Sequence, residues 1–151
     1  MVLRNFLLTP VGRVKVLRAG ILSALLLATL VAWGVSSPPG SSPDEDYHLV
    51  SSWCAYGDRE DACLAGSDSG SRIVPQATVE VADCFRFNEG ESAACQLTSL
   101  VDIAAGPDTE TERGNFDGSY PPGFYAVMGL LVIPDSLVAS VLVMRMFNIA
   151  L

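Results

Sequence analysis

One uncharged stretch near the N-terminus constrains this chain more than any other feature. It covers residues 19–36, AGILSALLLATLVAWGVS, and holds eighteen residues without a charged side chain. As an α-helix it would extend about 27 Å, close to the hydrocarbon thickness of a bilayer. Arg13, Lys15 and Arg18 directly precede it, and Trp33 lies near its far end, where an indole suits the membrane interface. We therefore expect a transmembrane helix with a cytoplasmic N-terminus.

A cleaved signal peptide is the alternative interpretation, because a basic segment followed by an apolar segment is typical of both. No clean Ala-x-Ala cleavage site follows the apolar run, and the run is long for a signal peptide. A small secreted disulfide protein released after Ser36 is disfavoured for a second reason, since its apolar C-terminal tail would expose a large hydrophobic surface to water. The sequence therefore favours an uncleaved anchor.

The charged residues divide the 151-residue chain, whose size allows one ordinary domain, into segments. Residues 1–18 are basic, whereas residues 37–123 hold sixteen of the seventeen acidic residues and only four arginines. Residues 124–151 are apolar apart from Asp135 and Arg145. The net charge of −8 argues against nucleic acid as a partner. We expect a plasma-membrane protein whose partner is the lipid bilayer, with residues 37–123 as an extracytoplasmic loop.

All four cysteines lie in this acidic loop: Cys54, Cys63, Cys84 and Cys95. An even number of cysteines in an oxidising compartment predicts two disulfides, for which three connectivities exist. We favour local pairing, Cys54 with Cys63 and Cys84 with Cys95, because the intervening segments are short and carry glycine and acidic residues. A zinc site is the alternative, but the sequence contains no Cys-x-x-Cys pair, and we predict no metal site of this kind.

The C-terminal apolar region, residues 124–151, is interrupted. Its first run, FYAVMGLLVI, is ten residues long and too short to span a bilayer. Asp135 or Ser136 suits the N-cap of a new helix from about Leu137 to the chain end, roughly 22 Å long. Arg145 inside it is costly in a membrane unless it faces a polar cavity or a partner. We expect the start of a second transmembrane helix, in a truncated piece of a larger polytopic protein.

Patterns within the loop predict several short elements. Ser42 and Glu45 match a capping box with Pro43 at the first helical position, which predicts a helix from Pro43 to about Cys54. Residues 77–82 alternate as in a short strand, and residues 106–118 resemble an irregular loop. Residues 92–105 form an amphipathic pattern that suits either the membrane surface or a buried helix.

The predicted helix after Pro43 carries the candidate catalytic residues Asp44, Glu45 and His48. Their spacing places all three on one helix face. A carboxylate there is able to act as general base on an acceptor hydroxyl, or to hold a divalent cation against a phosphate. The simpler interpretation is an acidic helix start, favoured by the helix dipole, beside a solvated histidine. The spacing does not decide between the two.

Two motifs resemble a known family. Pro43-Asp44-Glu45-Asp46-Tyr47-His48 follows the first apolar helix, and the loop ends in Tyr120-Pro121-Pro122, where two prolines disfavour a helix. This arrangement resembles bacterial polytopic membrane proteins collected as domain of unknown function 2142, with loop cysteines as in an actinobacterial type. That family is in turn similar to the GT-C superfamily of membrane glycosyltransferases. The protein O-mannosyltransferases and lipid A aminoarabinose transferases are examples of that superfamily.

The resemblance implies specific roles. Asp44 or Glu45 would be the catalytic base or a carboxylate that positions a metal, and His48 would be the histidine of the acidic motif. Tyr120 and Arg145 would bind substrate: Tyr120 where the chain returns to the membrane beside the active site, and Arg145 facing the phosphate of a polyprenyl-phosphate sugar donor. Members of the superfamily have many transmembrane helices, so we expect these 151 residues to be inactive in isolation.

Two function classes follow from these expectations. The first is the N-terminal part of a glycosyltransferase that uses a lipid-linked sugar. The second is a non-enzymatic membrane-anchored envelope protein whose acidic, disulfide-stapled loop binds a partner or cations. In both, the expected fold is a membrane α protein with one N-terminal transmembrane helix, a disulfide-containing extracytoplasmic α+β loop, and the start of a second transmembrane helix.

Overall fold

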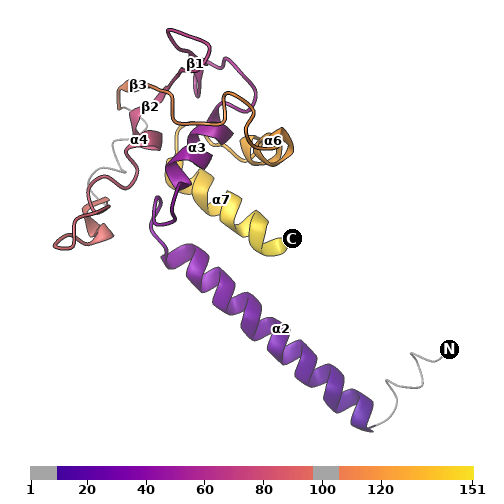
Figure 1. Ribbon diagram of the computed structural model, residues 1–151. Helices are drawn as coiled ribbons and strands as arrows, with labels where there is room; N and C mark the ends of the chain where they lie inside the picture. Colours follow the sequence, from indigo (N-terminus) through magenta and orange to yellow (C-terminus); the bar gives the residue numbers. More distant parts are fainter. Residues whose placement is uncertain (1–9, 97–105) are drawn as a thin grey trace.

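The computed structural model describes residues 10–96 and 106–151. A long helix, α2 (Pro10–Ser36), extends away from a folded unit formed by the rest of the described chain (Figure 1). Its segment Val11–Ser36 is long and apolar enough to cross a membrane, and none of its most apolar window is buried. The helix begins before the uncharged run, so Arg13, Lys15 and Arg18 belong to the helix itself.

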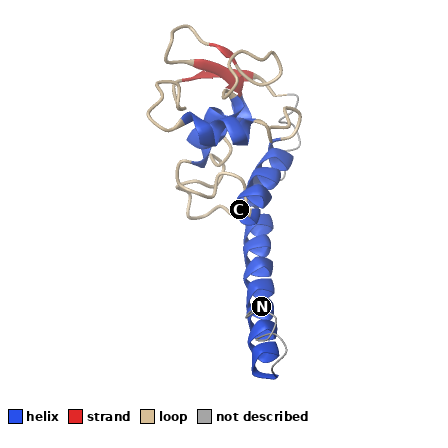
Figure 2. Ribbon diagram, turned by 90° about the vertical axis from the view of Figure 1, so that its right-hand side faces the viewer, coloured by secondary structure: helices blue, strands red, loops and turns tan. Residues whose placement is uncertain are grey.

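The folded unit combines short helices with one small sheet. Its elements in chain order are α3 (Glu45–Trp53), β1 (Leu64–Ala65), β2 (Arg72–Pro75), α4 (Gln76–Val79), the 3₁₀ turn η1 (Ala93–Cys95), β3 (Asp108–Thr111), α6 (Pro122–Gly129) and α7 (Leu137–Ala150). The strands pair antiparallel in the order β1-β2-β3, with Ile73 opposite both Leu64 and Glu110. The sheet lies at the end of the unit farthest from α2 (Figure 2). The expected α+β character of this region is confirmed.

Helix α3 is central because it is apolar on two sides. Leu49 and Trp53 belong to a cluster that includes the buried side chains Met128, Leu137, Val141 and Met144 of α6 and α7. Val50 belongs to a second cluster with Cys63 and Val74, beside the sheet. Trp53 is only 1% exposed and Val50 is fully buried. Helix α3 therefore joins the C-terminal helices to the sheet.

Both predicted disulfides are present. Cys54 is bonded to Cys63 and Cys84 to Cys95, with Cα–Cα distances of 5.2 Å and 6.1 Å. Both distances lie in the ordinary range for disulfides. The first bond joins the end of α3 to the edge of the sheet, where Cys63 is buried. Local pairing, one of three connectivities open to the sequence, is thus confirmed.

The strand predicted at residues 77–82 is wrong. The preceding segment, Arg72–Pro75, is the strand, and the chain then turns into α4. Pro75 has no N–H to donate to the ladder, which favours an end to strand pairing at this point. The Thr78 hydroxyl donates a hydrogen bond to the Pro75 carbonyl at 2.8 Å and stabilises the turn. A local hydrogen bond therefore replaces the extended conformation that the alternating pattern suggested.

The loop predicted at residues 106–118 contains a strand, β3. All four of its side chains are polar, so no hydrophobic alternation marks it in the sequence. The strand is fixed by pairing with β2 and by Glu110, whose Oε1 accepts hydrogen bonds from Ser67 N at 2.5 Å and Ser71 Oγ at 2.6 Å. Most of the amphipathic pattern predicted at residues 92–105 lies outside the described residues. Its beginning contains the 3₁₀ turn η1.

Two helix starts differ from prediction. Pro122 is the first residue of α6 and Pro121 its N-cap, so the proline pair begins a helix rather than preventing one. The first turn of a helix does not use its N–H groups, which is why proline is favoured there. Helix α3 begins at Glu45, not Pro43, and its N-cap Asp44 has a left-handed backbone. Only half of the capping box forms, since Ser42 N donates to Glu45 Oε2 at 3.3 Å.

Helix α7 (Leu137–Ala150) confirms the helix predicted from about Leu137 to the chain end. Ser136 is its N-cap, and the Ser136 side chain accepts a hydrogen bond from Ala139 N. Helix α7 packs against the last turns of α2 (Figure 2). Gly34 lies at this contact: a Cβ there would be 2.9 Å from Met146 Cε and 3.1 Å from Ile149 Cδ1. Cleavage after Ser36 would remove this packing.

Candidate functional site

The acidic run at the start of α3 sends its three carboxylates in different directions. Asp44 Oδ1 accepts from Arg113 Nη2 at 2.9 Å, and Glu45 Oε1 accepts from Arg145 Nη2 at 2.9 Å. Asp46 accepts from both Arg113 and Arg86. The arginines come from three distant parts of the chain. Each carboxylate therefore has a different environment, although the three are consecutive.

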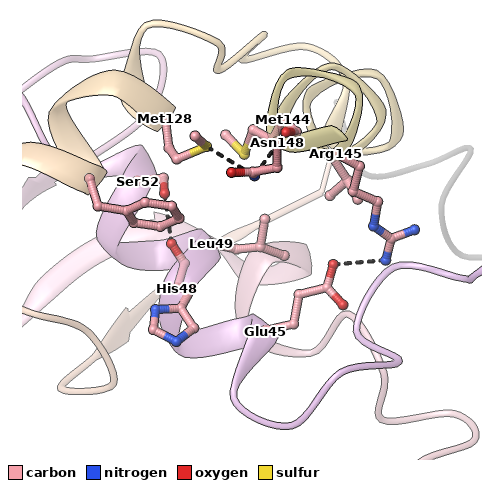
Figure 3. Close-up of a pocket in the computed structure, with 10 residues that line it drawn as sticks. Glu45, His48, Leu49, Ser52, Met128, Met144, Arg145 and Asn148 are labelled. Atoms are coloured by element: carbon pink, nitrogen blue, oxygen red, sulfur yellow. Dashed lines mark hydrogen bonds and ion pairs between the residues drawn. The ribbon is translucent and has the colours of Figure 1, made fainter. Parts of the chain in front are cut away.

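Glu45 and Arg145 form a largely buried ion pair, with side chains 14% and 19% exposed (Figure 3). Arg145 also donates to the carbonyls of Gly34 and Pro38 at 3.1 Å each, and to that of Ser37. These carbonyls lie at the C-terminal end of α2, where a helix dipole favours a positive charge. A charged residue inside an apolar helix thus has polar partners at both the end of α2 and the start of α3.

Asp46 is the most buried of the three carboxylates, with a side chain only 3% exposed. Burial raises its pKa, but hydrogen bonds from Arg113 and Arg86 outweigh that effect and lower the pKa to about 2. The same bond to Asp46 is the main reason that the pKa of Arg113 is raised. Asp46 is therefore a charged structural centre that holds two arginines.

Asp44 is the exposed member of the run. Its side chain is 68% exposed, and its backbone has φ 58° and ψ 15°, a conformation uncommon outside glycine. Its bond to Arg113, itself 43% exposed, lies at the surface. A strained backbone of this kind persists only where surrounding structure holds it, and such residues gather at functional sites.

A pocket of about 120 Å³, which we call the α3–α7 pocket, opens beside the Glu45–Arg145 pair (Figure 3). Glu45, His48, Arg145 and Asn148 line it together with apolar side chains of α3, α6 and α7: Leu49, Phe124, Met128, Val141 and Met144. Asp44 does not line it. The prediction that Asp44, Glu45 and His48 share one helix face is therefore wrong for Asp44, because its left-handed backbone takes it out of the helical periodicity.

His48 is held by an aromatic neighbour. Its Nδ1 lies 2.9 Å from Tyr125 Oη, and the two rings stack with centroids 5.9 Å apart. Tyr120, half exposed, places its ring centroid 5.9 Å from that of His48 and 5.8 Å from that of Tyr47. Tyr120, near the end of the acidic loop, therefore lies beside His48 of the acidic motif. It is not among the residues that line the α3–α7 pocket with Arg145.

Sequence reasoning assigned no role to Asp46, Arg113 or Tyr125. Asp46 belongs to the acidic motif, but nothing local distinguishes it from its neighbours as the buried member. Arg113 had a detectable signal, since it is the single basic residue between Arg86 and Arg145. Among the residues that the structure describes, no three His, Cys, Asp or Glu side chains are grouped closely enough to hold a metal ion.

A long apolar helix that is not buried, joined to a disulfide-stapled unit, defines a candidate membrane-anchored protein. Residues 27–151 match the family model described as predicted membrane protein (DUF2142), so the chain belongs to this family. The match includes the end of α2, the acidic motif, both disulfides and α7. A search of curated proteins and a search of solved structures each found no match.

Proposed function

We propose that this protein is the N-terminal part of a membrane glycosyltransferase that transfers a sugar from a polyprenyl-phosphate donor to an acceptor hydroxyl. Asp44 is the general base. The observation that carries this proposal is the contrast within the acidic run: only Asp44 combines an exposed carboxylate with a strained backbone. Its position a few residues beyond α2 would place the chemistry close to a membrane surface.

The proposed reaction is a single displacement. Asp44 takes the proton of the acceptor hydroxyl while the acceptor oxygen forms a bond to the anomeric carbon of the donor sugar. The bond between that carbon and the donor phosphate oxygen breaks, and its electron pair stays on the phosphate oxygen. The leaving group is the phosphate, which remains attached to its lipid. Transfer therefore inverts the anomeric configuration. Arg113 holds the Asp44 side chain in place through the 2.9 Å bond.

The other predicted residues take supporting roles in this proposal. Glu45 positions Arg145, which lines the α3–α7 pocket and is proposed to face the donor phosphate. The Tyr125 bond at Nδ1 leaves His48 Nε2 for a ligand, and Nε2 makes no hydrogen bond to any residue between 10 and 96 or 106 and 151. Tyr120 borders the same histidine and is proposed to contact substrate.

The proposed orientation has the N-terminus in the cytoplasm and the folded unit outside the plasma membrane. Arg13, Lys15 and Arg18 at the start of α2 support it, since positive charge is retained on the cytoplasmic side. The two disulfides support it independently, because such bonds persist in oxidising compartments.

A non-enzymatic anchored envelope protein is the second candidate. One observation favours it: all three carboxylates of the acidic run are paired with arginines, as in a purely structural network. In that case the loop would bind a partner through its acidic surface, and Asp44 would be replaceable without loss of any product.

Replacement of Asp44 in the gene that carries this chain tests the first proposal. Asp44→Asn should abolish one envelope glycan or glycolipid, measured by mass spectrometry against a deletion strain. Asp58→Asn is the matched control, because Asp58 is another exposed carboxylate of the same loop. Normal glycans with Asp44→Asn, in a strain where deletion removes them, would assign Asp44 to the structural network instead.

A further inference from the structure

We propose that a second cavity, which we call the Asp44 pocket, binds a neutral carbohydrate. Its volume is about 350 Å³, and it lies between the segment that follows α2 and the loop closed by the Cys84–Cys95 disulfide. A cavity of this size lies within the ordinary range for small-ligand sites. Its use as the acceptor site rests on the proposed function, whereas carbohydrate binding does not.

Phe87 gives the pocket an aromatic surface. Its side chain is 99% exposed and its backbone has φ 62°, a left-handed conformation that is strained for a bulky residue. An aromatic ring in open water adds nothing to folding stability, and a ligand that covers it would remove apolar surface from water. Phe85, two residues earlier, packs against the hydrophobic core and anchors the same loop. Phe87 is thus held outward on a fixed loop.

Polar side chains also line the pocket. Ser41, Ser42 and Asp44 line it with exposed side chains, two hydroxyls and one carboxylate. A sugar ring has apolar C–H faces and a rim of hydroxyls that both donate and accept hydrogen bonds. An aromatic ring in one pocket with hydroxyl and carboxylate groups matches these two surfaces at once. A hydrocarbon ligand would make no hydrogen bonds to the two serine hydroxyls.

The charges of the pocket favour a neutral ligand. Arg86 and Arg113 also line it, but both are bonded to Asp46, which is buried behind them. Arg113 is bonded in addition to Asp44. With two carboxylates against two guanidinium groups, the site has no net positive charge for a phosphate or a nucleotide. The recognition chemistry is therefore that of an uncharged sugar.

Nuclear magnetic resonance of the full chain in lipid nanodiscs, with ring-labelled phenylalanine, tests this site directly. The probes are neutral disaccharides of mannose, glucose, galactose and arabinose, with inorganic phosphate as the charged comparison. Phe87→Leu assigns the Phe87 signal. We expect that signal to shift saturably with at least one disaccharide, and phosphate to leave it in place.

Variants separate stacking from general folding. Phe87→Ala should weaken the disaccharide about tenfold, a loss of about 1.4 kcal/mol, and Phe87→Tyr should restore binding. Phe124→Leu is the matched control, because Phe124 is another phenylalanine with an exposed side chain but lines the α3–α7 pocket. No saturable shift with any disaccharide, equal affinity in Phe87→Ala, or a shift with phosphate alone would each overturn the proposal.

The outcomes also separate this inference from the proposed function. Loss of a glycan in Asp44→Asn without sugar binding at Phe87 would remove the carbohydrate site and leave the transferase. Phe87-dependent sugar binding in a chain whose Asp44→Asn variant makes normal glycans would confirm the site. It would also assign the protein to carbohydrate binding without transfer.

Discussion

Glu45 Oε1 and Arg145 Nη2 are 2.9 Å apart although one hundred residues separate them in the sequence. The same guanidinium donates to the carbonyls at the end of α2. One side chain of α7 therefore joins the exit of the long helix to the start of α3. The acidic motif next to it is held at a fixed position relative to α2.

Removal of Arg145 should destabilise the folded unit more than removal of Glu45 and Arg145 together. Arg145→Met leaves the Glu45 carboxylate buried and unpaired, which costs about 3 kcal/mol. The double variant Glu45→Gln with Arg145→Met leaves no buried charge and should cost less. Denaturation followed by the fluorescence of buried Trp53, in a Trp33→Phe background, measures both. The surface pair Arg59–Asp61 is the control, since the Asp61 side chain is 65% exposed and Asp61→Asn should cost less than about 1 kcal/mol.

A loss of stability in the double variant that equals or exceeds the loss in Arg145→Met would contradict this interpretation. It would mean that the bonds from Arg145 to the α2 carbonyls, rather than the pair with Glu45, account for its contribution.

Acid should weaken the folded unit through Asp46. Its pKa is lowered to about 2, so its contribution is fully present above pH about 4 and is lost as the pH falls through about 2. The loss is on the order of 2 kcal/mol. Asp46→Asn should be less stable than the native chain at neutral pH, and the difference should shrink below pH about 4. Glu110 also has a pKa of about 2 and titrates in the same range in both proteins. The measured quantity is therefore the difference in the free energy of unfolding between the native chain and Asp46→Asn at each pH. A constant difference down to pH about 2 would contradict the assigned role.

A single methyl group at Gly40 should disturb the start of the folded unit. Gly40 has φ +78°, and a Cβ there would lie 2.6 Å from Ala82 Cβ. Gly57 is the matched control, with φ +72° and nothing within 4 Å of its Cβ position. Both Gly→Ala variants bear backbone strain of about 1 kcal/mol, and only Gly40→Ala adds the clash. Thermal unfolding should therefore show a larger decrease in Tm for Gly40→Ala than for Gly57→Ala. Equal decreases in Tm would show that Ala82 moves aside freely.

Features fixed by local sequence were the predictable ones. The apolar run of α2, the short spacing of the cysteines and the Ser136 cap of α7 each depend on neighbouring residues, and the structure contains all three. β3 was missed because its polar side chains carry no alternation and its position depends on pairing with β2. Residues 77–82 were misassigned because the pairing of β2 ends before them, at Pro75.

In the candidate site, too, local features were predictable from the sequence and long-range contacts were not. The acidic motif and its histidine are visible in the sequence, and so is the isolated Arg113. The partner of each carboxylate is not visible, because the arginines lie between 40 and 100 residues away along the chain. The left-handed backbone of Asp44 was likewise unpredictable from helical spacing. Exposure, which distinguishes the proposed base, is a tertiary property.

The sidedness of the folded unit tests the central claim most directly, because a site outside the plasma membrane requires it. Glu112→Cys places a thiol at an exposed position just after β3, and Lys15→Cys places one near the start of α2. The four native cysteines do not react because they are held in disulfides. A membrane-impermeant maleimide applied to intact cells should label position 112 at once and position 15 only after permeabilisation. Labelling in the reverse order, or release of position 112 into the medium, would contradict the claim.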